Sequence, residues 1–155
     1  MKRVNLFDDD QLQVDEDEPP GYRAAYSGLR ERIGAERLAA TLVLLEQDQA
    51  VCPYHAELIE EEWLFVLAGA PTVRTPAGEQ VLEEGDVLCF PRGPAGAHRI
   101  ANAAPEPARV LIVSERAALA ATVYPDSDKI GIYGRDLRLL FRRSDQREYW
   151  DGEAG

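Results

Sequence analysis

The feature that most constrains the fold of this chain is a series of short apolar segments at even spacing. They follow one another at intervals of about eight to twelve residues, a spacing typical of all-β domains. The segments are residues 38–45, 63–67, 71–75, 80–82, 86–90, 98–101 and 108–114. Turn-forming sequences rich in Gly and Pro separate them, such as TPAG at 75–78. This punctuation predicts an all-β sandwich or barrel. Length and β-forming composition favour a strand for 38–45, although periodicity alone does not separate it from a buried helix.

The flanks differ in composition from this central region. Seven acidic residues precede position 19, and Pro19-Pro20 closes the segment. Like charges repel and extend a chain, so residues 1–20 are predicted to form a flexible acidic arm. Residues 21–155 are predicted to be a single domain. Within its C-terminal extension, 114–123 is ambiguous between helix and strand, while 130–141 predicts two short strands joined near Gly134.

Charge and composition exclude several classes of protein. The chain of 155 residues has 28 acidic and 17 basic side chains, a formal net charge of −11. Such a surface repels nucleic-acid phosphates and anionic membranes, so neither partner is expected. No apolar run approaches the roughly 20 residues that span a bilayer, and no apolar segment follows the basic start MKR. Two cysteines are too few for a disulfide framework, which predicts a reduced, cytoplasmic protein.

The candidate chemistry centres on the only two histidines, His55 and His98. Glu57 follows His55 by two residues, and side chains two apart on a strand leave the same face. Glu62 begins the next apolar segment, and His98 begins a later one. Imidazole and carboxylate groups are ligands of divalent metals, so these four residues are candidate ligands. A lone histidine is more often a hydrogen-bonded residue, and a triple glutamate is usually solvated, so the argument depends on the order of all the pieces.

That order resembles the cupin superfamily. Its first motif runs His-x-His, three or four residues, Glu, six residues, Gly; its second runs Gly, five residues, Pro-x-Gly, a short gap, His, three residues, Asn. The matching positions here are His55, Glu57, Glu62 and Gly69, then Gly85, Pro91, Gly93, His98 and Asn102. The resemblance, with a motif core at 53–102, implies a double-stranded β-helix, or jelly-roll barrel, and a metal held by His55, Glu57, Glu62 and His98.

The chain departs from the motifs at two places. Glu57 stands where the family usually has a second histidine, and the gap between Gly93 and His98 is longer than usual. Because Glu61 and Glu62 are adjacent, the sequence leaves open which of the two is the third ligand. The added carboxylate favours harder ions, so one divalent ion of Mn, Fe or Zn is expected. Four protein ligands on an octahedral ion leave two positions for water or substrate, an arrangement typical of catalytic sites.

The reaction itself stays open between alternatives. The resemblance implies a metal-dependent enzyme acting on a small polar molecule, either an isomerase or epimerase or a dioxygenase; the alternative is a non-catalytic module that binds or senses a small molecule. The YPDS element at 124–127 and the YWDG tail at 149–152 resemble small single-domain bacterial cupins, some of which are labelled sugar-phosphate-isomerase-like. A sugar phosphate would need cationic partners, but Arg99 should point away from His98 in one strand.

Two further expectations concern thiols and assembly. Cys52 and Cys89 are expected to be free, buried structural thiols, although one of them could approach the pocket. A homodimer is expected, because residues 22–45 and 130–150 carry more apolar and aromatic side chains than one small core needs.

Overall fold

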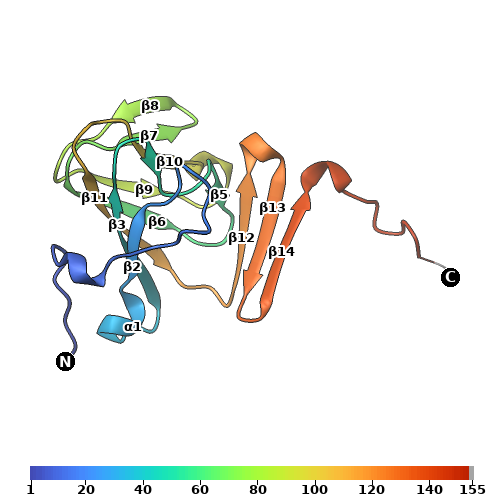
Figure 1. Cartoon of the computed structure of the whole chain (residues 1–155). Helices are drawn as coiled ribbons and strands as arrows, with labels where there is room; N and C mark the ends of the chain where they lie inside the picture. Colours follow the sequence, from blue (N-terminus) through green and yellow to red (C-terminus); the bar gives the residue numbers. More distant parts are fainter. Residues whose placement is uncertain (154–155) are drawn as a thin grey trace.

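The computed structural model describes residues 1–153, and most of its regular secondary structure is antiparallel β-strand (Figure 1). A barrel of two facing sheets holds the hydrophobic core, and a smaller C-terminal sheet projects from one side of it. The prediction of an all-β jelly-roll barrel is confirmed.

The first sheet has six strands, and they supply most of the core. Their spatial order is β1 (Gln13–Val14), β2 (Ala25–Gly28), β3 (Leu38–Leu45), β11 (Ala108–Glu115), β6 (Glu62–Ala68) and β9 (Val87–Phe90). Alternation along the central strands points Leu64 and Val66 inward, where both are buried. Trp63 on the same strand points outward and is exposed.

The second sheet closes the barrel from the opposite side. Its order is β4 (Gln49–Ala50), β10 (Arg99–Asn102), β7 (Thr72–Thr75) and β8 (Gly78–Val81). Val73 and Ile100 form a cross-strand pair, and both are buried in the core against Leu64 and Val110. The arginines beside them, Arg74 and Arg99, therefore lie on the outer face.

A third sheet extends away from the barrel at the C-terminal end (Figure 1). Its order is β14 (Leu137–Arg142), β13 (Lys129–Gly134), β12 (Leu119–Tyr124) and β5 (Ala56–Glu57). The ambiguous segment 114–123 thus belongs mainly to strands, and the predicted pair of strands near Gly134 is present. His55, directly before β5, forms an isolated bridge with His98, directly before β10 of the second sheet. The pairing of β12 with β5 therefore attaches the third sheet to the barrel at this point.

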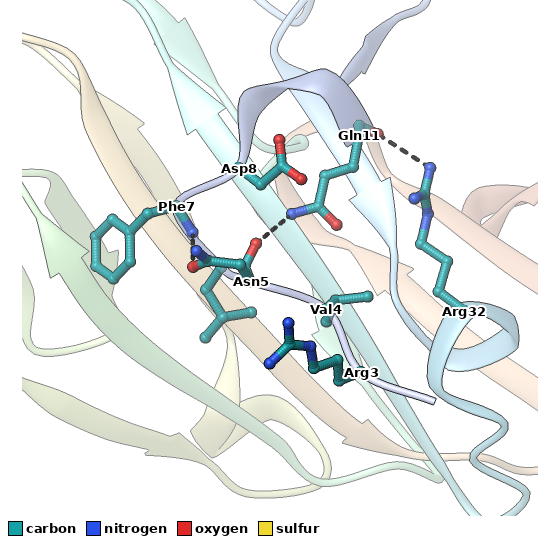
Figure 2. Close-up of a pocket in the computed structure, with 8 residues that line it drawn as sticks. Arg3, Val4, Asn5, Phe7, Asp8, Gln11 and Arg32 are labelled. Carbon is teal, nitrogen blue, oxygen red and sulfur yellow. Dashed lines mark hydrogen bonds between the residues drawn. The ribbon is translucent and has the colours of Figure 1, made fainter. Parts of the chain in front are cut away.

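The N-terminal residues lie along the first sheet. A 3₁₀ turn, η1 (Asp9–Gln11), precedes β1, and the Gln11 side-chain amide donates to the Asn5 carbonyl at 2.8 Å (Figure 2). The buried guanidinium of Arg109 donates to the Leu6 carbonyl at 2.9 Å and pairs with Asp9. An open cavity of about 700 Å³ is lined by residues 3–8, Gln11 and Arg32. That residues 1–20 form a flexible arm outside the domain of residues 21–155 stays a prediction.

The helical content is small. Besides η1, residues 1–153 contain one α-helix, α1 (Arg30–Ile33), and three further 3₁₀ turns, namely η2 (Pro94–Gly96), η3 (Pro125–Ser127) and η4 (Arg143–Asp145). Within residues 1–153, no helix has the length and apolar character that crossing a membrane requires.

Candidate metal centre

His55 and His98 meet although 42 residues lie between them in the sequence. Each precedes a strand, β5 or β10, and the two form an isolated antiparallel bridge. The His55 amide donates to the His98 carbonyl at 3.0 Å, and the His98 amide donates back at 2.8 Å. Their ring centroids are 4.5 Å apart, so both imidazoles face the same interior space.

The backbone sets the tautomer of both imidazoles. His55 Nδ1 lies 3.0 Å from the Pro53 carbonyl, and His98 Nδ1 lies 2.9 Å from the Gly96 carbonyl. A carbonyl only accepts, so each Nδ1 carries a hydrogen, and in the neutral imidazole Nε2 then presents a lone pair. This is the orientation found in metal-bound histidines. Burial, and next the neighbouring His98, lower the pKa of His55, which favours the neutral imidazole that a metal requires.

The carbonyl that orients the His98 ring belongs to Gly96, a position where only glycine fits. A side chain at Gly96 would place its Cβ 1.8 Å from the Pro91 carbonyl oxygen, which no residue tolerates. The motif residue Gly69 is constrained in the same way, because its φ is +81° and a Cβ would lie 2.6 Å from the Pro107 carbonyl oxygen.

Glu62 completes a three-residue group. Its Oε1 lies 3.0 Å from His98 Nε2, and donor atoms of His55, Glu62 and His98 all lie within 4.8 Å of one another. Adjacent ligands of one ion with bonds of about 2.1 Å are about 3 Å apart, so this group fits a divalent metal. Glu61 points elsewhere, since its Oε1 accepts from the Trp63 indole at 2.8 Å on the outer face.

Glu57 lies at the edge of this group. Its Oε1 is 3.7 Å from His55 Nε2, but it is not among the three residues whose donor atoms converge. The Thr122 hydroxyl holds the carboxylate instead, at 2.8 Å and 3.1 Å from its two oxygens. Burial raises the pKa of Glu57 to about 7, against the lowering effect of the Thr122 hydrogen bond, and the charge of Glu62 raises it further.

Aromatic residues that the motifs did not identify surround the imidazoles. The Phe90 ring stacks on His98 at 3.6 Å, and the Tyr124 ring lies 6.2 Å from His55. The Tyr124 hydroxyl is 2.9 Å from that of Tyr133, and burial followed by this bond raises the pKa of Tyr124. Only the assignment of 119–124 as a strand beside β5 would have pointed to Tyr124.

The two cysteines have different surroundings. Cys52 Sγ lies 3.3 Å from His55 Nδ1, and burial, followed by the charges of Glu62 and Glu57, raises the pKa of its thiol. The neutral thiol is therefore the stable form beside the candidate ligands. Cys89 is exposed on β9, away from them, so it does not form the buried thiol that was expected.

Comparison with known proteins gives a consistent assignment. Residues 41–114 match the cupin domain family. A protein from Acidithiobacillus ferrooxidans provisionally named sugar phosphate isomerase shares 25% identity and a TM-score of 0.79, over 89% of this chain and 87% of the other. A sugar phosphate isomerase of the cupin superfamily from Silicibacter pomeroyi gives 22% and 0.80, over 93% and 96%.

More distant structures share the fold. The polyketide cyclase RemF from Streptomyces resistomycificus has 22% identity and a TM-score of 0.60, over 74% of this chain and 79% of its own. None of the curated proteins matches the sequence. With the two motifs, the jelly-roll barrel and the family match at 41–114, this protein contains a domain of the cupin superfamily.

Proposed function

We propose that this protein binds one divalent metal ion, Mn, Fe or Zn, and is an enzyme that acts on a small polar molecule. The observation that carries the proposal is the pair of inward histidines, each with Nδ1 fixed by a backbone carbonyl and Nε2 directed beside Glu62. A structural role for the histidines would need only hydrogen bonds, whereas two adjacent lone pairs and a carboxylate form a cation site.

Glu57 is proposed as the fourth ligand. Its 3.7 Å separation from His55 Nε2 is compatible with two ligands of the same ion, and Thr122 already orients the carboxylate. Two imidazoles and two carboxylates would balance the charge of a divalent ion. This set has one more carboxylate ligand and one fewer imidazole than the usual cupin set of three histidines and one glutamate. The additional oxygen ligand favours harder ions.

An isomerase-type reaction is the preferred reading of the chemistry. The structural relative with 25% identity carries the name of a sugar phosphate isomerase, and its length matches this chain. A metal in this site would supply Lewis-acid polarisation of a carbonyl or hydroxyl group. Tyr124 and Phe90 border the imidazoles and would exclude water from one side of a bound substrate, and Tyr133 holds the Tyr124 hydroxyl.

The first experiment is metal analysis of protein purified without chelator or affinity-tag metal. We expect about one metal ion per chain, and far less in His98→Ala, because that change removes one of the two lone-pair donors. Arg92→Gln, on the exposed rim, is the control and should retain the metal. Full occupancy in His98→Ala would contradict the assignment. Isomerase activity would then be measured on sugar phosphates with the metal found.

A homodimer is proposed on the basis of an exposed apolar surface. The exposed apolar side chains are Leu137, Leu139 and Phe141 on one face of β14, Leu140 on its other face, and Tyr149 and Trp150 in the C-terminal tail. Together they expose on the order of 800 Å², about the area that each partner buries in a standard interface. β14 is also the edge of its sheet, and an apolar edge is a liability unless it is covered. A second copy is the proposed occupant, because it carries the same surface and a twofold interface is self-complementary.

The cytoplasm is proposed as the location. Two free cysteines, Cys52 and Cys89, support a reducing compartment.

A further inference from the structure

A second polar pocket lies on the outer face of the barrel, away from the metal centre. It has a volume of about 460 Å³ and lies between strands β7 and β10 and the turn that leads into β13. Three of its lining residues are cationic, namely Arg74, Arg99 and Lys129, and each is half-buried. This is a concentration of positive charge in a chain whose net charge is −11.

Two of the cations occupy an unfavourable position for strand pairing. Arg74 and Arg99 are direct cross-strand partners in the β7–β10 ladder. Like charges directly opposite each other destabilise a sheet, so a fold without another use for them would separate them. Their neighbours Val73 and Ile100 are buried in the core, which places both guanidinium groups outside.

Only one of the two arginines is neutralised by an ion pair. Arg74 binds Asp126 through two hydrogen bonds, of 2.5 Å and 3.0 Å. Arg99 has no ion-pair partner among residues 1–153, although its charge lowers the pKa of Asp126 after the larger effects of Arg74. With Glu79 also at the wall, three cations face two carboxylates, and the pocket retains one net positive charge.

Aromatic rings hold the cationic groups in place. The Arg74 guanidinium lies 4.0 Å from the centroid of Tyr54, and Lys129 Nζ lies 5.3 Å from that of Tyr124. Such stacking fixes long side chains that would otherwise lose conformational freedom on binding. The hydroxyl of Ser127 lines the same space and adds a neutral donor.

We propose that this pocket binds an oxyanion of the phosphate type, with Arg99 and Lys129 as the principal donors. The bonds between Arg74 and Asp126 show that an oxyanion fits the geometry of this wall, because the carboxylate already makes them. Guanidinium groups recognise phosphate and carboxylate oxygens through the same paired donors. The site is distinct from the metal centre, since His98 points inward and the adjacent Arg99 points outward, and the inference does not rest on the proposed enzymatic function.

The test is calorimetric titration of the full-length protein with inorganic phosphate at low ionic strength, in a buffer without phosphate. Glycerol phosphate is titrated in parallel, to distinguish the free ion from a phosphate ester. Arg99→Gln should weaken binding about tenfold, because a charge-assisted donor is lost. Asp126→Asn should tighten it several-fold, because a competing carboxylate is removed. Arg92→Gln and Asp136→Asn make the same changes in net charge elsewhere and should leave the affinity near that of the wild type.

Arg99→Gln and Asp126→Asn are expected to change the affinity for phosphate in opposite directions, which makes the result decisive. Lys129→Gln provides an independent loss of charge if Arg99→Gln does not fold. Amide chemical shifts under phosphate should move at Tyr54, Arg99 and Lys129. The proposal is overturned if phosphate does not bind, if Arg99→Gln and Lys129→Gln bind it as the wild type does, or if the shifts occur only around His55 and His98. A preference for glycerol phosphate over phosphate would identify a phosphate ester as the ligand class.

Discussion

Replacing Thr122 by valine tests whether the hydroxyl of that residue controls the Glu57 carboxylate. Thr122 is buried, and its hydroxyl hydrogen is directed to Glu57, at 2.8 Å and 3.1 Å from the two oxygens. Valine keeps the shape and removes the donor. A hydrogen bond to a charged group contributes about 1.5–3 kcal/mol, against about 0.5–1.5 kcal/mol for a neutral pair. We therefore expect the free energy of unfolding of metal-free protein to fall by about 2 kcal/mol where Glu57 is ionised.

The effect should depend on pH in a defined direction. Burial raises the pKa of Glu57 from 4.5 in the unfolded chain to about 7 in the fold, so the folded state binds more protons between these values. Stability of the metal-free protein therefore falls as pH rises through this window. Removing the donor raises the folded pKa further and deepens the fall. The loss in Thr122→Val should thus be larger at about pH 8 than at about pH 5.5.

The assay is urea unfolding after removal of metal by a chelator, at both pH values. Thr75→Val is the matched control, because the Thr75 hydroxyl bonds only the backbone of the β7–β8 turn. Its loss of stability should be the same at the two pH values. Equal losses for Thr122→Val at both, or no loss at about pH 8, would refute the reasoning.

Three other changes test the site, the core and the assembly. Glu57→His restores the usual cupin ligand set and should shift competition among Mn, Fe, Zn and Cu toward the softer ions; an unchanged profile would show that Glu57 does not bind the metal. Leu64→Ala removes a fully buried side chain and should cost about 2–5 kcal/mol in urea unfolding, whereas a loss under 1 kcal/mol would mean a poorly packed barrel. Phe141→Glu should convert the dimer to a monomer of 17.2 kDa by light scattering, while Val81→Glu, at another exposed apolar position on β8, should not. A wild-type mass near 17.2 kDa would contradict the dimer.

The central strands could be predicted because their residues carry a local signal. Segment 38–45 is apolar and β-forming along its whole length, and β3 has these bounds. The strands β1, β4 and β5 have only two residues each, too few for any pattern of alternation, and they form because longer strands offer them backbone partners. Their positions are tertiary information that no window of sequence contains.

In the candidate metal centre, too, some features could be predicted from local sequence and others depend on tertiary contacts. Motif order identified His55, Glu62 and His98, which the structure brings together, and alternation correctly directed Arg99 away from His98. Alternation also placed Glu57 on the His55 face, but it could not show that Thr122 binds its carboxylate, because that contact joins residues 65 apart. The cross-strand pairing of Arg74 with Arg99 likewise depends on the register between β7 and β10.

The groups around the candidate metal centre come from two parts of the chain, the matched cupin domain and the segment that follows it. The matched cupin domain ends at residue 114 and contains all four candidate ligands. Strand β12 begins at Leu119, outside that domain, yet its pairing with β5 places Thr122 opposite Glu57. The same sheet places Tyr124 beside His55, and Tyr133 contacts the Tyr124 hydroxyl. A chain shortened after residue 115 would keep every candidate ligand but lose the donor that orients Glu57 and the tyrosine beside His55, so the C-terminal sheet is part of the candidate site and not an appendage to the barrel.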